Sequence, residues 1–499
     1  MAARPLVRGT SGRNFSRSGN HMKPTALRLS FLLAGVLLLA GCAENKRLTT
    51  SSPDALRYYQ EGVSLYEKFY YREAGEAIDK AIRADSAFAM AWARRAMLSW
   101  GMKGESQSKA EIARALQLSQ AVSRREQLFI RMWHHRINYA IKEAGETADS
   151  LIALYPDERE AYFFRGLNYE MTKNYDAAIR SYLKALDVDS LYTPAVMSLG
   201  YAYSAQGEQQ KAIAYMERYI RLAPGAADPR ASYADLLLHG GRYEEALEQY
   251  RKSLELKPDY WYAFQKIGEI NATLGRLREA EENYHKSLTL LPGKHEGSRL
   301  VMDAKLEMLR ADYEGALKLC RQALEIDSTK GDAAAIMVSA LARLKNFPEA
   351  EGTLDRIYSE FQKRNLTETP SVYGFYLIKA RMLTEKGAFA EALAACERSL
   401  QYAPGLERGG VYSLIADIRF RQGEYEPALD ACEEALSAMP NNPFVLLTLL
   451  KTYHAKGDTR MTTEIGKRLL NLWDRADPDF HYLREAKRIL GRQTSLTAR

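Results

Sequence analysis

The sequence has few cysteines, four among 499 residues, and no surplus of one charge beyond its N-terminus. Of its 70 basic and 63 acidic side chains, eight basic and one acidic lie within residues 1–48, so the remaining charges balance. Proteins that bind nucleic acid through its phosphates carry a clustered basic surplus. The charge distribution therefore argues against a nucleic-acid partner.

Motifs of known catalytic chemistry are also missing. The chain has no phosphate-binding Walker loop, no GxSxG nucleophile elbow, no CxxC pair and no kinase signature. His134 and His135 are adjacent, so on a helix they would point about 100° apart, unlike histidines at i and i+4 that chelate one metal ion. The sequence predicts no catalytic, metal or cofactor site, and a protein that is not an enzyme.

The N-terminal apolar stretch is too short to span a membrane. Leu29–Ala40 covers about a dozen residues, whereas a spanning helix needs about 20. Lys23 and Arg28 supply the basic region that precedes the apolar core of a secretion signal. We therefore expect a secretion signal rather than a permanent transmembrane helix.

The end of this segment, Leu39-Ala40-Gly41-Cys42, resembles the bacterial lipobox. The resemblance implies that residues 22–42 are a lipoprotein signal peptide and that Cys42 becomes the lipidated first residue of the mature protein. Several acyl chains give stable attachment where one gives only marginal binding. Ala43, rather than aspartate, follows the cysteine, which implies the outer membrane of the cell envelope, facing the periplasm. A plain signal peptide without lipid is the alternative.

Residues 1–21 are rich in arginine and serine and contain no acid, which is also a feature of organellar transit peptides. An internal start at Met22 is simpler, because everything that a signal peptide needs begins there; the upstream residues are then a mis-called start or an extended basic region. Residues 43–54 read as a short polar tether.

The rest of the chain repeats with a period of 34 residues. Ala178, Ala212, Ala246 and Ala280 keep this spacing, and so do Pro224, Pro258 and Pro292. Small residues allow two helices to approach closely, and a proline ends a helix. Glycines recur where a left-handed residue ends the first helix of a pair, at Gly207, Gly241, Gly275, Gly387, Gly423 and Gly457. The pattern predicts repeated pairs of antiparallel helices.

This pattern resembles the tetratricopeptide repeat. The resemblance implies an all-α protein, a right-handed α-solenoid of about twelve helix-turn-helix repeats over residues 55–476, with a capping helix and tail at 477–499. Residues 365–372 are an insertion, and 89–124 form one degenerate unit. The clear units are 55–88, 125–158, 159–192, 193–226, 227–260, 261–294, 297–330, 331–364, 373–406, 409–442 and 443–476.

The cysteines of the repeat region occupy core positions. Cys320, Cys396 and Cys432 stand where other repeats have tyrosine or methionine. Equivalent points of adjacent repeats lie on the order of 10 Å apart, whereas a disulfide needs Cα atoms within about 7 Å. We expect buried, reduced thiols.

The family resemblance also implies a function and a binding surface. It predicts a membrane-anchored scaffold for protein–protein interactions, in envelope assembly or secretion, that binds a protein or peptide in a concave groove. The fifth and ninth places of each repeat face this groove, and the early repeats place an apolar stripe there: Tyr59, Phe129, Trp133, Phe163, Leu167, Met197 and Tyr201.

Other interpretations of the stripe and of the chain stay open. In the alternative interpretation, the stripe residues pack against neighbouring helices and do not bind a partner. The family's lysine-plus-asparagine clamp for a C-terminal carboxylate is missing, which favours an apolar or helical ligand. A module that senses a small ligand is the second functional hypothesis, and an enzyme that processes glycans or peptides is the third.

Overall fold

The computed structural model describes residues 48–497 except 103–104, 292, 294, 364–365, 368–371, 404 and 406. The start at Met22, the signal peptide, Cys42 and most of the tether lie outside the described residues. No helix of the described part has both the length and the apolar character needed to cross a membrane.

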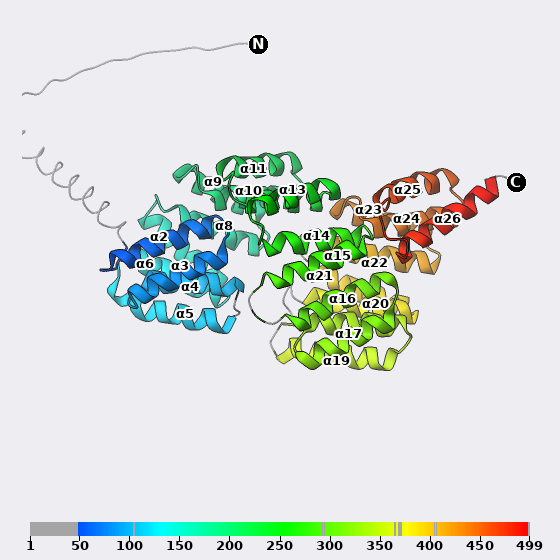
Figure 1. Ribbon diagram of the computed structural model, residues 1–499, viewed down its shortest axis with the longest axis horizontal. Helices are drawn as coiled ribbons and strands as arrows, with labels where there is room; N and C mark the ends of the chain where they lie inside the picture. The colour runs from blue at the N-terminus through cyan, green and yellow to red at the C-terminus, as the bar shows by residue number, and fades with distance from the viewer. Residues whose placement is uncertain are drawn as a thin grey trace, which may run out of the picture. The chain divides into compact units, whose positions relative to one another are not determined.

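The described residues form helices joined by short turns, without a strand, which confirms the predicted all-α class (Figure 1). In chain order the helices are α2 (Pro53–Glu67), α3 (Tyr71–Ala84), α4 (Ala89–Met102), α5 (Glu105–Leu118), α6 (Arg124–Ile137), α7 (Ile141–Leu154), α8 (Arg159–Met171), α9 (Tyr175–Val188), α10 (Thr193–Ala205), α11 (Gln209–Leu222), α12 (Asp228–His239), α13 (Tyr243–Leu256), α14 (Trp261–Thr273), α15 (Leu277–Thr289), α16 (Glu296–Arg310), α17 (Tyr313–Ile326), α18 (Gly331–Arg343), α19 (Phe347–Lys363), α20 (Tyr373–Lys386), α21 (Phe389–Tyr402), α22 (Glu407–Gln422), α23 (Tyr425–Ala438), α24 (Pro443–Lys456) and α25 (Thr459–Leu472). Successive helices such as α8 and α9, or α20 and α21, pack against each other as pairs. A last helix, α26 (His481–Thr497), follows them. Residues 89–124, which the sequence analysis takes as one degenerate unit, contain α4 and α5, and these two helices pack against each other.

The repeat has small residues where the two helices of a pair cross closely. A Cβ atom added at Gly166 would lie 2.3 Å from the ring of Tyr182, and one added at Gly200 would lie 2.7 Å from Cε of Met216. Such distances are far below van der Waals contact, so a larger residue would force the two helices of the pair apart. The glycine at the turn has the expected left-handed conformation, with φ of +79° at Gly207 and +83° at Gly387.

The cysteines behave as core residues. Cys320, Cys396 and Cys432 are fully buried and unbridged, which confirms the prediction of reduced thiols. Burial raises the pKa of each thiol to about 12, because the low-polarity interior disfavours the thiolate. These thiols are therefore unreactive near neutral pH.

The chain forms two compact units. Among the described residues, unit 1 comprises residues 48–61 and 75–140, and unit 2 comprises residues 62–74 and 141–497. In unit 1 the aromatic side chains of α4 and α6 pack together, with ring centroids of Trp100 and Trp133 6.4 Å apart. The core of unit 2 follows the array from one helix pair to the next.

Unit 2 also contains contacts between helix pairs that are far apart in sequence. The Asp477 amide donates to the carbonyl of Gly275 at 2.9 Å, and Trp473 Nε1 donates to the carbonyl of Thr273 at 3.2 Å. Trp473 and Phe480 are consequently buried in one core cluster with Leu277. In an ideal solenoid each repeat contacts only its neighbours. Here the turn of the α14–α15 pair binds the loop that follows α25.

Further contacts of the same kind lie elsewhere in unit 2. Lys173 Nζ, in the turn after α8, donates to the carbonyl of Ala403 at 3.3 Å. Asn441 Nδ2, in the loop after α23, donates to the carbonyl of Gly241 at 3.4 Å. Turns between the helices of one pair thus repeatedly bind loops five or six pairs further along the chain.

Candidate functional site

The predicted apolar stripe is largely inside the molecule rather than on its surface. Tyr59, Phe129, Trp133 and Phe163 expose only 4 to 5% of their area, while Leu167, Met197 and Tyr201 are half-buried. The expectation of a water-facing row of aromatic side chains is therefore corrected: these residues pack against helices of the array. Partner binding by them stays a prediction.

The packing partners of the stripe account for its burial. The ring of Tyr59 lies 5.1 Å from that of Phe88, and the ring of Phe163 lies 5.5 Å from that of Tyr192. Tyr201 donates a hydrogen bond to Asp235 at 3.1 Å. Aromatic pairs at these distances stabilise a core.

An open cavity of about 650 Å³ lies further along unit 2, and we call it the C-terminal groove. The first helices of five successive pairs line it, α16, α18, α20, α22 and α24, and α26 closes one side. Residues at the ninth place, or at the fifth and ninth places, of four later repeats line this groove: Ser339, Arg381, Ser413, Asp417, Leu447 and Lys451.

The groove combines apolar and charged walls. Met308 and Leu309 line it from α16, and Phe444 and Leu447 line it from α24. Ligand sites of proteins have volumes of about 300–1,000 Å³ and are largely apolar with a few polar groups that fix orientation. The groove has both features.

Carboxylates neutralise three of the cationic side chains. Glu385 lies 3.3 Å from Arg343 and 2.9 Å from Arg421. Lys451 lies 2.7 Å from Glu485. Although burial alone would raise it, the pKa of Glu385 is held below its ordinary value by the two arginines, so this carboxylate is charged at neutral pH.

Arg381 differs from its neighbours in the groove. It lies on α20, the central helix of the five, and its side chain is exposed to the groove. No hydrogen bond or ion pair joins its guanidinium to another described residue. The surrounding walls desolvate it and lower its pKa below the ordinary value, with a further contribution from the positive charge of Arg343.

A second charged cluster lies in α12 and is closed to solvent. Asp228 accepts hydrogen bonds from the hydroxyls of Tyr219 at 3.0 Å and Tyr260 at 2.9 Å. Asp235 accepts from Tyr250 and Tyr262. Burial raises the pKa of Asp228 to about 6 and raises that of Asp235. The sequence analysis missed this network, because its members come from α11 to α14 and share no local motif.

A third cluster has the donor types of a metal site. Ligand atoms of Glu281, His285 and Asp303 all lie within 4.8 Å of one another. His285 Nε2 lies 2.7 Å from Asp303 Oδ1, while Arg299 and Arg310 pair with the two carboxylates at 2.8 and 3.3 Å. The arginines already compensate these carboxylates. No metal was predicted here, since Asp303 comes from the next repeat.

Comparison with protein families identifies the repeat. Models described as "TPR repeat" and "Tetratricopeptide repeat" match residues 234–275 and 307–366, and a further tetratricopeptide-repeat model matches 141–192, 173–227 and 337–407. Residues 141–227, 234–275 and 307–407 of the chain therefore match tetratricopeptide repeats. Repeats of this family imply a scaffold for protein–protein interaction, and the fold is typically non-catalytic.

Solved structures of other proteins match parts of this chain. A crystal structure of MamA matches at 25% identity and a TM-score of 0.28, covering 32% of this chain and 93% of that one. The type IV pilus biogenesis factor PilW matches at 14% and 0.36, covering 41% and 94%. A tetratricopeptide-repeat protein from Parabacteroides merdae matches at 18% and 0.31, covering 59% and 98%. No curated protein matches the chain.

Proposed function

We propose that this protein is a lipid-anchored scaffold of the bacterial cell envelope that binds a segment of a partner protein in the C-terminal groove. The observation that carries the proposal is the groove itself, an open cavity of about 650 Å³ lined by five successive first helices. Assembly of envelope components or secretion is the process that fits a membrane-anchored scaffold.

The anchor rests on the resemblance of residues 39–42 to a lipobox. The first described residues support a short connection between Cys42 and unit 1. The Thr49 amide donates to Glu126 Oε1 at 2.9 Å, and Thr50 Oγ1 donates to Asp85 at 2.6 Å. Seven Cα–Cα steps separate Cys42 from the docked Thr49, and they span at most about 25 Å when extended. A lipid on Cys42 would therefore hold unit 1 close to the membrane surface.

The anchor is tested with Cys42→Ser. We expect this change to block lipidation and to move the protein from the membrane fraction to the soluble or uncleaved fraction. Fractionation of cells and the mass of the mature N-terminus measure both effects. A processed and fully membrane-bound Cys42→Ser protein would contradict the anchor.

The groove is tested by co-purification from detergent-solubilised membranes. We expect a stoichiometric protein partner with the wild type and its loss with Ser413→Trp, because the indole would fill the groove. Ser150→Trp on the exposed face of α7 is the matched control and should retain the partner. A bound small molecule without a protein would favour the ligand-sensing alternative, and an unaffected Ser413→Trp protein would contradict the groove as binding site.

A further inference from the structure

The C-terminal groove has an uncompensated positive charge at its centre. Arg381 stands on α20, with two lining helices before it in the chain and two after it. Arg343, Arg421 and Lys451 each have a carboxylate partner at 3.3 Å or less. Arg381 makes no hydrogen bond or ion pair with a described residue, although the groove wall carries Glu385, Asp417 and Glu485.

The guanidinium of Arg381 has unused hydrogen-bond donors that face the groove. A guanidinium has five N–H donors, and in the empty groove only water is available to them. The nearby carboxylates cannot relieve Arg381, because each already pairs with another cation. An anionic group brought in by a ligand would gain charge-assisted hydrogen bonds that are stronger than neutral ones.

The walls around Arg381 define the rest of the ligand. Met308 and Leu309 lie on one side of the groove, and Phe444 and Leu447 lie on the side of α24. A single phosphate or carboxylate would leave these apolar side chains in water. A peptide with apolar residues before and after an acidic one would cover them and would also reach Arg381.

We propose that the partner segment bound in the C-terminal groove carries an acidic side chain between apolar ones, and that Arg381 pairs with this carboxylate. The proposal rests on the proposed function, since it names the chemistry of the partner for the same groove. The recognised group is an internal Asp or Glu side chain rather than a chain terminus.

The probe is a set of heptapeptide pools, acetylated at the N-terminus and joined at the C-terminus through an amide to an uncharged BODIPY fluorophore, so that neither the termini nor the dye carries charge. The central residue is Glu, Gln or Lys, and the other positions are random mixtures of Leu, Phe and Ala. Each pool is titrated with the purified full chain in detergent, and binding is followed by fluorescence anisotropy. We expect the Glu pool to bind the wild type about tenfold more tightly than the Gln pool, and the Lys pool more weakly still.

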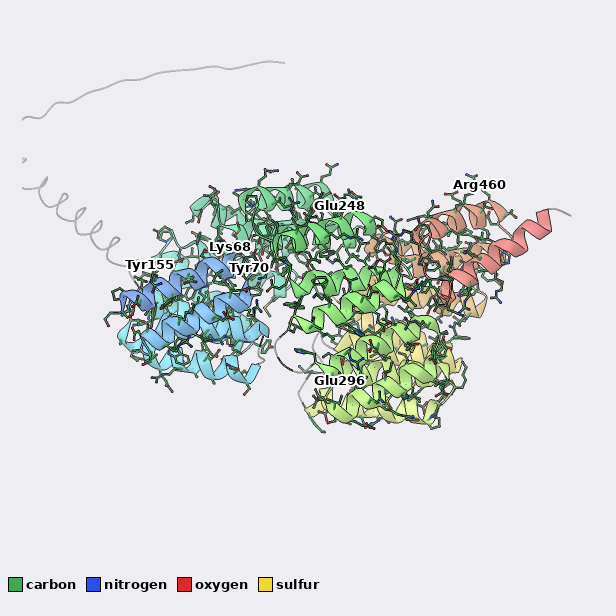
Figure 2. The ribbon with its side chains drawn as sticks, viewed as in Figure 1. Lys68, Tyr70, Tyr155, Glu248, Glu296 and Arg460 are labelled. Carbon is green, nitrogen blue, oxygen red and sulfur yellow. The ribbon has the colours of Figure 1, made fainter. Side chains whose placement is uncertain are left out.

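Variants of Arg381 assign the preference to this residue. Arg381→Gln should reduce the preference for Glu over Gln to less than about twofold, and Arg381→Glu should reverse it in favour of Lys. The matched control is Arg460→Gln, because Arg460 is exposed on α25 and does not line the groove (Figure 2). It should bind like the wild type. Circular dichroism melts verify that each variant is folded.

Three outcomes would overturn the inference. The first is equal binding of the Glu and Gln pools by the wild type. The second is an Arg381→Gln protein that keeps the preference for Glu. Alternatively, a Glu-centred pool with only Ser at the other positions would bind as tightly and be displaced by inorganic phosphate, which would indicate a site for small anions. A failure of the proposed function is distinguished from these outcomes by the co-purification experiment, in which the Ser413→Trp protein would still retain the protein partner.

Discussion

The ninth place of the repeat carries a charged residue in both α12 and α20, and the two residues have opposite surroundings. Asp235 in α12 is 8% exposed and accepts hydrogen bonds from Tyr201, Tyr250 and Tyr262. Arg381 in α20 is exposed to the groove and has no partner among the described residues. One position on the same scaffold thus supports either internal packing or ligand binding.

The difference comes from the neighbouring first helices. Tyr201 belongs to α10 and Tyr262 to α14, so aromatic side chains from both sides close over Asp235. The corresponding neighbours of Arg381 are smaller, Ser339 in α18 and Gly410 in α22, and leave the groove open. Polar groups buried in a closed region need hydrogen-bond partners within the protein, whereas a charged side chain in an open groove can remain available to a binding partner.

The largest effect is expected from Asp235→Leu, which removes the acceptor of three tyrosine hydroxyls. Each buried donor without a partner costs about 1–3 kcal/mol, so we expect the free energy of unfolding to fall by about 3 kcal/mol or more. Urea unfolding followed by circular dichroism measures it. Asp430→Leu on the exposed face of α23 is the control and should change stability little. A loss at Asp235 no larger than the control would show that the network does not stabilise α12.

The second prediction concerns the pH dependence of the closed region. The pKa of Asp228 is about 6 in the folded protein and about 4 when unfolded, so the folded state binds the proton more tightly. Its contribution to stability is present below about pH 4 and is lost as the pH rises through about 6. Tyr219 and Tyr260 stay protonated throughout, since burial raises the pKa of both.

The measurement compares the wild type with Asp228→Asn between pH 4 and pH 7. The wild type should lose about 2 kcal/mol relative to the variant over this range, because a two-unit shift of one group corresponds to about that free energy. Differences in urea midpoint at each pH provide the comparison. Parallel pH profiles of the two proteins would contradict the raised pKa of Asp228.

A smaller effect is expected from a helix cap that acts across the array. Asp477 Oδ2 accepts from the Arg278 amide in the first turn of α15 at 3.0 Å, and Asp477 Oδ1 lies 3.1 Å from the Arg278 guanidinium. Asp477→Ala should lower the free energy of unfolding by about 1 kcal/mol, as loss of an N-cap does. Asp458→Ala removes a local cap on α25 and should cost a similar amount. No measurable loss at Asp477 alone would contradict the long-range cap.

The sequence predicts the local structure well, because the 34-residue period reports contacts within and between adjacent pairs. The close approach of Gly166 to Tyr182 and the left-handed turn at Gly207 follow from residue type and spacing alone. The cap of α25 by Asp458 is of the same local kind. A period in sequence therefore predicts the fold.

Longer-range features could not be predicted in this way. The rotation from one pair to the next is small and accumulates along the array, so the sequence does not show that Asp477 reaches Gly275. The same limit applies to the burial of the predicted stripe residues. Large aromatics such as Trp133 and Phe163 indicate groove positions, but whether neighbours cover them depends on how adjacent helices pack.

The smallest change in stability is expected at Arg381, and it tests the comparison between Arg381 and Asp235, the two charged residues at the ninth place of the repeat. Arg381→Gln removes a charge that no described residue compensates, so stability should stay the same or rise, by no more than about 0.5 kcal/mol because solvent in the groove screens the charge. The same urea titration used for Asp235→Leu measures it. Binding sites commonly retain such unfavourable groups at some cost in stability. A clear loss of stability in Arg381→Gln would instead make Arg381 part of the internal packing, like Asp235.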